Sequence, residues 1–214
     1  MNATPADIAV DLGEGIDALG LALDARQRKQ LADYLALLAK WNKTYNLTAI
    51  REPARMVTHH ALDSLAVLPH LPSTPALRVL DVGSGGGLPG IPIAIARPDW
   101  RVVMVDPNHK KAAFLTQAAI ELGLSNAAAY ATRVEDLRNE TPFDLVISRA
   151  FADLATFASS SARHLAPHGA LVAMKGVHPA EEIEQVKDAF AVEPIAIAVP
   201  GLDASRHLVF MRKP

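Results

Sequence analysis

Apolar positions near the start of the chain recur with the period of a helix. Across residues 27–41 they are spaced by three and four, which predicts an amphipathic helix with Asp24 as its N-cap. Residues 42–50 are polar and predict a loop. A second helix is expected over residues 52–65, where Pro53 suits the first helical position.

The pattern changes at residue 77, after which short apolar runs alternate with helical segments. Strands are expected near residues 77–82, 101–106, 127–131, 143–148, 169–175, 193–199 and 205–211. Helices are expected between them, near residues 88–97, 109–122, 152–163 and 179–189. This order predicts an α/β fold, a mostly parallel seven-stranded sheet with helices on both faces. The last two strands form a predicted hairpin, which leaves one strand antiparallel.

The length of the chain bounds its domain organisation. With 214 residues, half of them hydrophobic, it suits one ordinary domain but not two independent cores. We therefore expect an N-terminal helical extension, residues 1–76, packed on a core of residues 77–214, and we expect a monomer. No apolar run has the length of a membrane span, and the first residues lack the pattern of an export signal, so the expected location is cytoplasmic.

Cysteine content and charge narrow the chemistry. The chain has no cysteine, which excludes disulfides, thiolate ligands and cysteine nucleophiles, and no pairing of its histidines indicates a metal site. The net charge is −2, yet residues 26–55 carry seven basic and two acidic residues. This basic stripe could contact phosphates, although a solvated helix face explains the charge equally well.

A glycine-rich segment carries the strongest functional signal. An apolar run that contains Asp81 leads into the segment Gly83–Gly90, where bare backbone N–H groups would be open to a ligand. Asp106 ends the next strand, at a place where a carboxylate can accept hydrogen bonds from both ribose hydroxyls of an adenosine. Together these features favour S-adenosylmethionine as the ligand.

The same glycines also fit a dinucleotide fingerprint. Gly85, Gly87 and Gly90 have its spacing, and Asp106 follows at about 20 residues, so an NAD-dependent oxidoreductase is an alternative. Asp81 argues against NAD, because a carboxylate two residues before the first glycine would repel a pyrophosphate but suit the ammonium of a methionine. Hydride chemistry also usually needs a separate substrate domain, and nothing in this chain supplies one.

The loop after the fourth strand bears on both the site and the acceptor. Ser148 and Arg149 fall beside the carboxyl ends of the strands, so Arg149 is a candidate site residue, with a structural ion pair to Asp144 or Asp153 as the alternative. Carbon-5 methylation of pyrimidines needs a cysteine, and methylation of adenine amines usually needs an Asn/Asp-Pro-Pro-aromatic loop; both are absent. A ring nitrogen with a free lone pair needs no general base, so we expect no catalytic side chain.

Several segments together resemble one known family. They are Lys40-Trp41-Asn42-Lys43 with Tyr45-Asn46-Leu47-Thr48, His60-x-Leu62-Asp63-Ser64, Asp81 to Pro92, Arg133-Val134-Glu135, Ile147-Ser148-Arg149-Ala150-Phe151 and Lys175-Gly176. On these segments, within residues 30–180, the chain resembles the bacterial small-subunit ribosomal RNA guanine-N7 methyltransferases, also called the RsmG or glucose-inhibited division protein B family.

The resemblance implies a Rossmann-like class I methyltransferase fold with S-adenosylmethionine as cofactor. It implies that Asp106 binds the ribose and that further cofactor contacts come from Gly83, Gly85, Leu88, Val134, Glu135 and Arg149. It also implies the acceptor, N7 of the guanine at position 527 in the 530 loop of 16S ribosomal RNA, and hence that RNA or the small ribosomal subunit as partner, with no membrane or metal. The alternative for Glu135 is a solvated acid in a loop, without a cofactor contact. The alternative for the function of the whole chain is a non-catalytic RNA-binding module on this fold.

Overall fold

The computed structural model describes residues 5–214, with side chains from residue 11 onward, and its strands form one sheet. The strand order is β3-β2-β1-β4-β5-β7-β6. The bounds are β1 (Arg78–Val82), β2 (Arg101–Val105), β3 (Ala127–Tyr130), β4 (Phe143–Arg149), β5 (Leu165–Lys175), β6 (Ala191–Ile197) and β7 (Arg206–Arg212). Strands β1 to β5 pair in parallel, and β7 runs antiparallel to β5 and β6. The predicted sheet, including its antiparallel hairpin strand, is confirmed.

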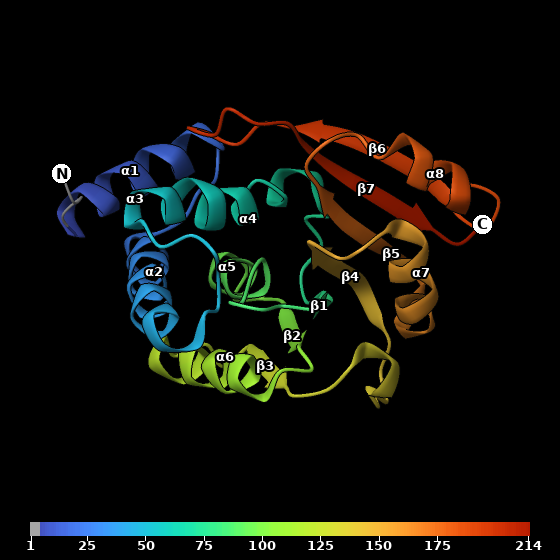
Figure 1. Cartoon of the computed structure of the whole chain (residues 1–214), viewed down its shortest axis with the longest axis horizontal. Helices are drawn as coiled ribbons and strands as arrows, with labels where there is room; N and C mark the ends of the chain where they lie inside the picture. The colour runs from blue at the N-terminus through green and yellow to red at the C-terminus, as the bar shows by residue number, and fades with distance from the viewer. Residues whose placement is uncertain (1–4) are drawn as a thin grey trace.

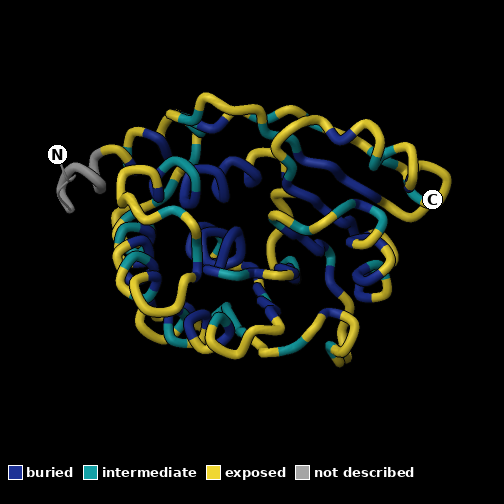
Figure 2. The backbone as a smooth tube through the Cα atoms, viewed as in Figure 1, coloured by how far each residue is buried: buried dark blue, intermediate teal, exposed yellow. Residues whose placement is uncertain are grey.

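Helices cover both faces of the sheet, as predicted (Figure 1). One face packs against α5 (Gly90–Ala96), α6 (His109–Glu121) and the N-terminal helices, and the other against α7 (Leu154–Ser161) and α8 (Ala180–Val186). Successive strand residues point to opposite faces, so Val79 joins the first hydrophobic core and Leu80 the second. Figure 2 shows the buried positions gathered along the strands and the inner sides of the helices.

The N-terminal region is helical, and it departs from the prediction at two places. Its elements are α1 (Pro5–Ala18), α2 (Ala25–Tyr45), α3 (Pro53–Met56), the π-helical turn η1 (Val57–Leu62), α4 (Asp63–Leu65) and the 3-10 turn η2 (Leu68–His70). Asp24 caps α2 in a capping box with Gln27, as predicted. Helix α1 was not predicted. Helix α2 also continues beyond residue 41, because the Asn42 side chain bonds the loop, at Thr48 N and Ile50 O, instead of competing for its own helix.

The N-terminal helices and the sheet share one hydrophobic core. Leu31, Leu38 and Leu65 from the helices belong to the same buried cluster as Val79 and Ile91 from the core region. The proposed division of the chain at residue 76 therefore does not coincide with a gap in packing. Within the described part of the chain, no helix is both long and apolar enough to cross a membrane.

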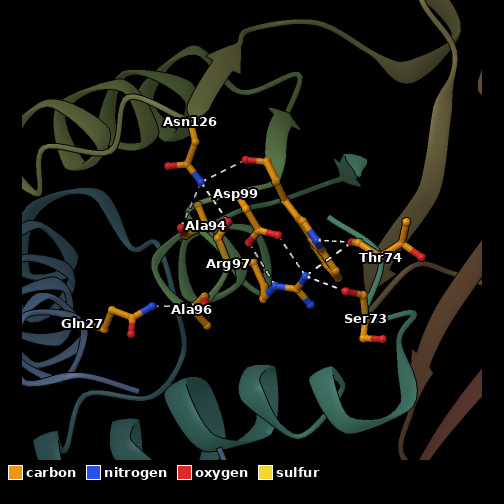
Figure 3. Close-up of polar contacts among 9 residues, drawn as sticks. Gln27, Ser73, Thr74, Ala94, Ala96, Arg97, Asp99 and Asn126 are labelled. Carbon is orange, nitrogen blue, oxygen red and sulfur yellow. Dashed lines mark hydrogen bonds and ion pairs between the residues drawn. The ribbon is translucent and has the colours of Figure 1, made fainter. Parts of the chain in front are cut away.

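Helix α5, which follows the glycine loop, is anchored at its far end by other segments (Figure 3). Gln27 Nε2, from α2, donates to the carbonyls of Ile95 and Ala96 in the last turn of α5, at 2.9 and 3.1 Å. Asn126, just before β3, donates to the carbonyls of Ala94, Arg97 and Trp100. Most of these bonds satisfy carbonyls that the end of α5 leaves unpaired, and together they fix the helix that follows the glycine loop.

Candidate functional site

The glycine loop is shaped both by backbone conformation and by open space. Gly83, Gly85 and Gly87 have φ of 70°, 56° and 89°, the left-handed region that favours glycine. A Cβ at Gly83 would meet nothing within 4 Å, and one at Gly85 only the Gly83 carbonyl, at 3.9 Å. A Cβ at Gly87 would instead lie 2.7 Å from Ile91. The first two glycines therefore leave room for a ligand, whereas Gly87 is required for packing.

Strand alternation brings three charged side chains to the same face of the sheet. Val79 and Met104 point into the first core. Asp81 lies two residues beyond Val79, and Asp106 lies two residues beyond Met104, so both aspartates share that face. Arg149 lies two beyond Ile147, the register partner of Asp81 and another member of that core. Because these strands are parallel, their ends meet at one edge, where ligands of open α/β sheets bind.

Asp81 is fully buried, and one of its carboxylate oxygens lacks a partner. Oδ2 accepts a hydrogen bond from Gly90 N at 2.9 Å, but Oδ1 has no partner among the described residues. Burial raises the pKa of Asp81 to about 7, against the lowering effect of the Gly90 hydrogen bond and the positive charge of Arg149. A buried oxygen of this kind suits a cationic hydrogen-bond donor such as an ammonium group.

Asp106 organises the loop around the space that it faces. Its Oδ2 accepts from Gly85 N at 3.0 Å and its Oδ1 from Asn108 N at 2.9 Å, and Lys111 Nζ lies 4.0 Å away. Each oxygen of a carboxylate has further acceptor capacity, so two vicinal hydroxyls can still bind. The predicted position of this carboxylate at the end of β2 is confirmed.

Arg149 has a structural partner that differs from both candidates considered from the sequence. Its Nη1 donates to the carbonyl of His59 at 2.8 Å and to Asp63 Oδ2 at 3.1 Å. Asp144 instead accepts from the backbone of β1, and Asp153 caps α7. The alternative, an ion pair of Arg149 with Asp144 or Asp153, is therefore wrong, since the acidic partner of Arg149 is Asp63.

The segment between β3 and β4 forms a loop with one 3-10 turn, η3 (Val134–Asp136), held from η4 (Ala162–His164). Val134 is buried in the second core, and its carbonyl accepts from His164 Nε2 at 2.8 Å. Glu135 is exposed, and its carbonyl accepts from Arg163. Leu88 is buried in the first core. Contact of Val134, Glu135 or Leu88 with a cofactor stays a prediction.

The extension supplies residues to this region that the sequence did not identify as site residues. Tyr34 Oη, fully buried, donates to the carbonyl of Gly86 at 2.6 Å. His60 Nε2 contacts Thr48 Oγ1 at 2.8 Å, and burial, assisted by the charge of Arg149, lowers the pKa of His60 to about 4. His60 is therefore neutral at physiological pH. The only sequence signal for Thr48, His60 and Asp63 was their place in the family-like segments.

The basic stripe divides into paired and open charges. Lys29 binds Asp33 at 2.6 Å, and Arg28 binds Asp17 at 2.5 Å. Lys40, Lys43 and Arg51 instead line a groove of about 400 Å³ between α2 and the start of α3, with Ala36, Ala39, Asn42 and Pro53. No ion pair with a described residue occupies these three cations, which are called the basic groove below. Of the other cations in the stripe, Arg55 pairs with Glu52, and Arg26 has no ion pair with a described residue but lines a different groove.

Comparison with known proteins agrees with this geometry. The family model described as rRNA small subunit methyltransferase G matches residues 27–209. A Ribosomal RNA small subunit methyltransferase G from Nitrosospira multiformis is 51% identical and is aligned over 96% of this chain and 97% of its own length. One from Burkholderia pseudomallei is 53% identical over 92% of this chain and 88% of its own.

Solved structures with the same fold are more distant. The N-methyltransferase NodS from Bradyrhizobium japonicum, in complex with S-adenosyl-L-homocysteine, has a TM-score of 0.58 at 17% identity, over 83% of this chain and 98% of that one. TrmN from Thermus thermophilus has a TM-score of 0.55 at 20% identity, over 71% of this chain and 48% of that one. These likenesses confirm the class I methyltransferase fold. On the family match and the close relatives, the chain belongs to the rRNA small subunit methyltransferase G family.

Proposed function

We propose that this protein transfers a methyl group from S-adenosylmethionine to N7 of the guanine at position 527 of 16S ribosomal RNA. The single observation that carries the cofactor is the unpaired, buried Oδ1 of Asp81 beside an open glycine loop, on the face that Asp106 and Arg149 share. Membership of the family supports 16S ribosomal RNA as the substrate. The particular guanine follows from the family resemblance. Its N7 follows from that resemblance and from the sequence-based expectation that no side chain acts as a general base.

Three polar groups of the proposed cofactor have a matching group in the protein. Asp81 Oδ1 would accept from the ammonium, Arg149 would bind the carboxylate of the methionine moiety, and Asp106 would hold the ribose hydroxyls. Gly83 and Gly85 leave the backbone accessible, and Leu88, Val134 and Glu135 complete the proposed contacts. When bound, the sulfonium supplies an electrophilic methyl group.

The protein's own contribution to the reaction is positioning. N7 of guanine carries a lone pair and no proton, so no side chain has to remove one. The neutral His60, fixed by Thr48, adds no charge that would repel the sulfonium. Holding the two reactants in line can supply most of the acceleration of such a transfer.

The basic groove is the proposed contact for the RNA backbone. Lys40, Lys43 and Arg51 gather on the extension, which also covers the glycine loop through Tyr34. Contacts of this kind bind phosphates and position the RNA without reading its sequence, so the folded loop presented must supply specificity. Residues 1–76 are thus proposed to be the extension that binds RNA, and residues 77–214 the core that binds the cofactor.

The test is methyl transfer in vitro. Small subunits and naked 16S ribosomal RNA from cells that lack this activity are incubated with the protein and isotopically labelled S-adenosylmethionine, and the label is mapped by mass spectrometry of nuclease fragments. We expect label at N7 of guanine 527. Label at another nucleotide would contradict the proposed acceptor, and no label despite cofactor binding would favour a non-catalytic RNA-binding module. Calorimetric binding of NAD without binding of the sulfonium compound would favour the oxidoreductase.

A further inference from the structure

We infer that Asp63 of the extension is a positioning residue: it holds one edge of the Arg149 guanidinium so that the other edge faces the cofactor. This inference rests on the proposed function, because it takes Arg149 as the group that binds the methionine carboxylate. Asp63 itself touches neither reactant. Its effect would reach the cofactor only through Arg149.

The geometry around Asp63 is that of a two-sided clamp. Its side chain is only 4% exposed, with Oδ2 3.1 Å from Arg149 Nη1 and Oδ1 2.7 Å from Arg206 Nε. Nη1 of Arg149 also donates to the carbonyl of His59 at 2.8 Å. The segment from His59, in η1, to Asp63, at the start of α4, therefore fixes this nitrogen with two acceptors.

The other edge of the guanidinium remains available. Among hydrogen bonds between described residues, Nε and Nη2 of Arg149 have none, although a guanidinium has five donors in a fixed fork. Its charge reaches the site, since it is one of the influences that lower the pKa of Asp81 against the dominant effect of burial. A carboxylate bound at this open edge would lie opposite the one that already holds Nη1.

Two further features indicate that the clamp serves the site as well as the fold. Ala150, directly after Arg149, has φ of 62°, a costly conformation for alanine that redirects the chain at the end of β4. The turn beside Asp63 is π-helical, a rare form that occurs often at functional sites. A buried carboxylate between two arginines is in addition a weak source of stability by itself, because desolvation offsets much of the attraction.

The first experiment separates positioning from stability. Binding of S-adenosylhomocysteine is measured by calorimetry, and the melting temperature by circular dichroism, for the natural protein, Asp63→Asn and Asp17→Asn. The Asp17→Asn control breaks an exposed aspartate–arginine pair between α1 and α2, away from the site. We expect Asp63→Asn to weaken binding roughly tenfold and Asp17→Asn to leave it unchanged. Unchanged affinity in Asp63→Asn, or an equal loss in both variants, overturns the inference.

A double-mutant cycle tests whether the effect passes through Arg149. Adding Asp63→Asn to Arg149→Gln should cause no further loss of affinity, and a further roughly tenfold loss would overturn the inference. If Asp63→Asn does not fold, the charge-balanced variant Asp63→Asn/Arg206→Gln replaces it, with Arg206→Gln as its reference and the same expected loss. Failure of the natural protein to bind S-adenosylhomocysteine would instead contradict the proposed function.

Discussion

At the scale of one residue, the buried carboxyl of Asp81 lowers the stability of the ligand-free protein near neutral pH. Its carboxyl is fully buried, with one oxygen bound to Gly90 N and the other unpaired. Because burial raises its pKa to about 7, above the ordinary 3.8, the folded protein binds a proton between these values that the unfolded chain does not. The free energy of unfolding therefore falls as pH rises towards 7, and an ammonium ligand would restore the loss.

Replacing Asp81 by asparagine should separate stability from binding. We expect Asp81→Asn to raise the free energy of unfolding of the ligand-free protein at pH 8 by roughly 1 to 3 kcal/mol, and to remove the decline between pH 5 and 8. Binding of S-adenosylhomocysteine should fall strongly at every pH. In the natural protein, affinity should increase from pH 6 to pH 8. Urea unfolding and calorimetry across this range measure both, and a pH-independent affinity in the natural protein would contradict the role of Asp81.

Gly85 tests the open space of the glycine loop. We expect Gly85→Val to abolish cofactor binding, because a side chain there would enter the space where the ligand approaches, while the fold survives a strain of roughly 1 to 2 kcal/mol. Gly123→Val is the matched control, since Gly123 also has positive φ and open space, but lies after α6, away from the loop. Calorimetry and melting temperature are compared. Normal affinity in Gly85→Val would show that the ligand lies elsewhere.

At the scale of elements, helix α5 depends on side chains from distant segments. Asn126 donates to three carbonyls around its end, and Gln27 to two more. The sequence predicted the helix from its apolar residues but gave no indication of these bonds, because amides at positions 27 and 126 carry no periodic signal. Its position, and with it that of the glycine loop, is therefore a tertiary property.

Removing the Asn126 amide should lower the stability of the protein by a large amount for a single side chain. We expect Asn126→Ala to lower the free energy of unfolding by roughly 1 to 3 kcal/mol, because three carbonyls lose their donor in a partly buried region. Gln185→Ala, which removes an exposed amide on α8, is the control and should change it by less than about 0.5 kcal/mol. Guanidinium unfolding measures both. Equal values would mean that water replaces the lost bonds.

At the scale of the whole molecule, residues of the extension contact residues of the core around the candidate site. The core supplies Asp81, Asp106 and Arg149 at the ends of its strands, while the extension supplies Tyr34 against Gly86 and Asp63 against Arg149. The extension also carries the basic groove. RNA and cofactor are thus proposed to meet where these two regions pack together.

Removal of the basic groove should affect RNA alone. We expect Lys40→Ala/Lys43→Ala/Arg51→Ala to weaken binding of 16S ribosomal RNA and to reduce its salt slope by up to about 3, with unchanged affinity for S-adenosylhomocysteine. The control, Arg101→Ala/Lys187→Ala/Lys213→Ala, removes three exposed cations that lie outside the basic stripe. Filter binding at several salt concentrations compares the two. Equal losses would mean that only net charge matters, and the groove would then be ordinary solvated surface.

The sequence by itself determined the order of strands and helices, the cap at Asp24, the glycine loop and the carboxylates that flank it. Those features depend on residue period and on local backbone preference, which neighbouring residues express without help from the rest of the chain. The sequence did not predict helix α1. It also predicted α2 too short, because tertiary contacts of Asn42 override the local preference of that residue.

Only the tertiary structure decided which charged side chains form ion pairs and which remain unpaired. Arg149 pairs with Asp63 and not with Asp144 or Asp153, which are nearer along the chain. The basic stripe contains paired cations and the basic groove. The pair of Asp63 with Arg149 joins side chains 86 residues apart along the chain, so it depends on how the extension packs across the sheet. No local pattern encodes that packing, because it is set by the shapes of the buried surfaces that meet.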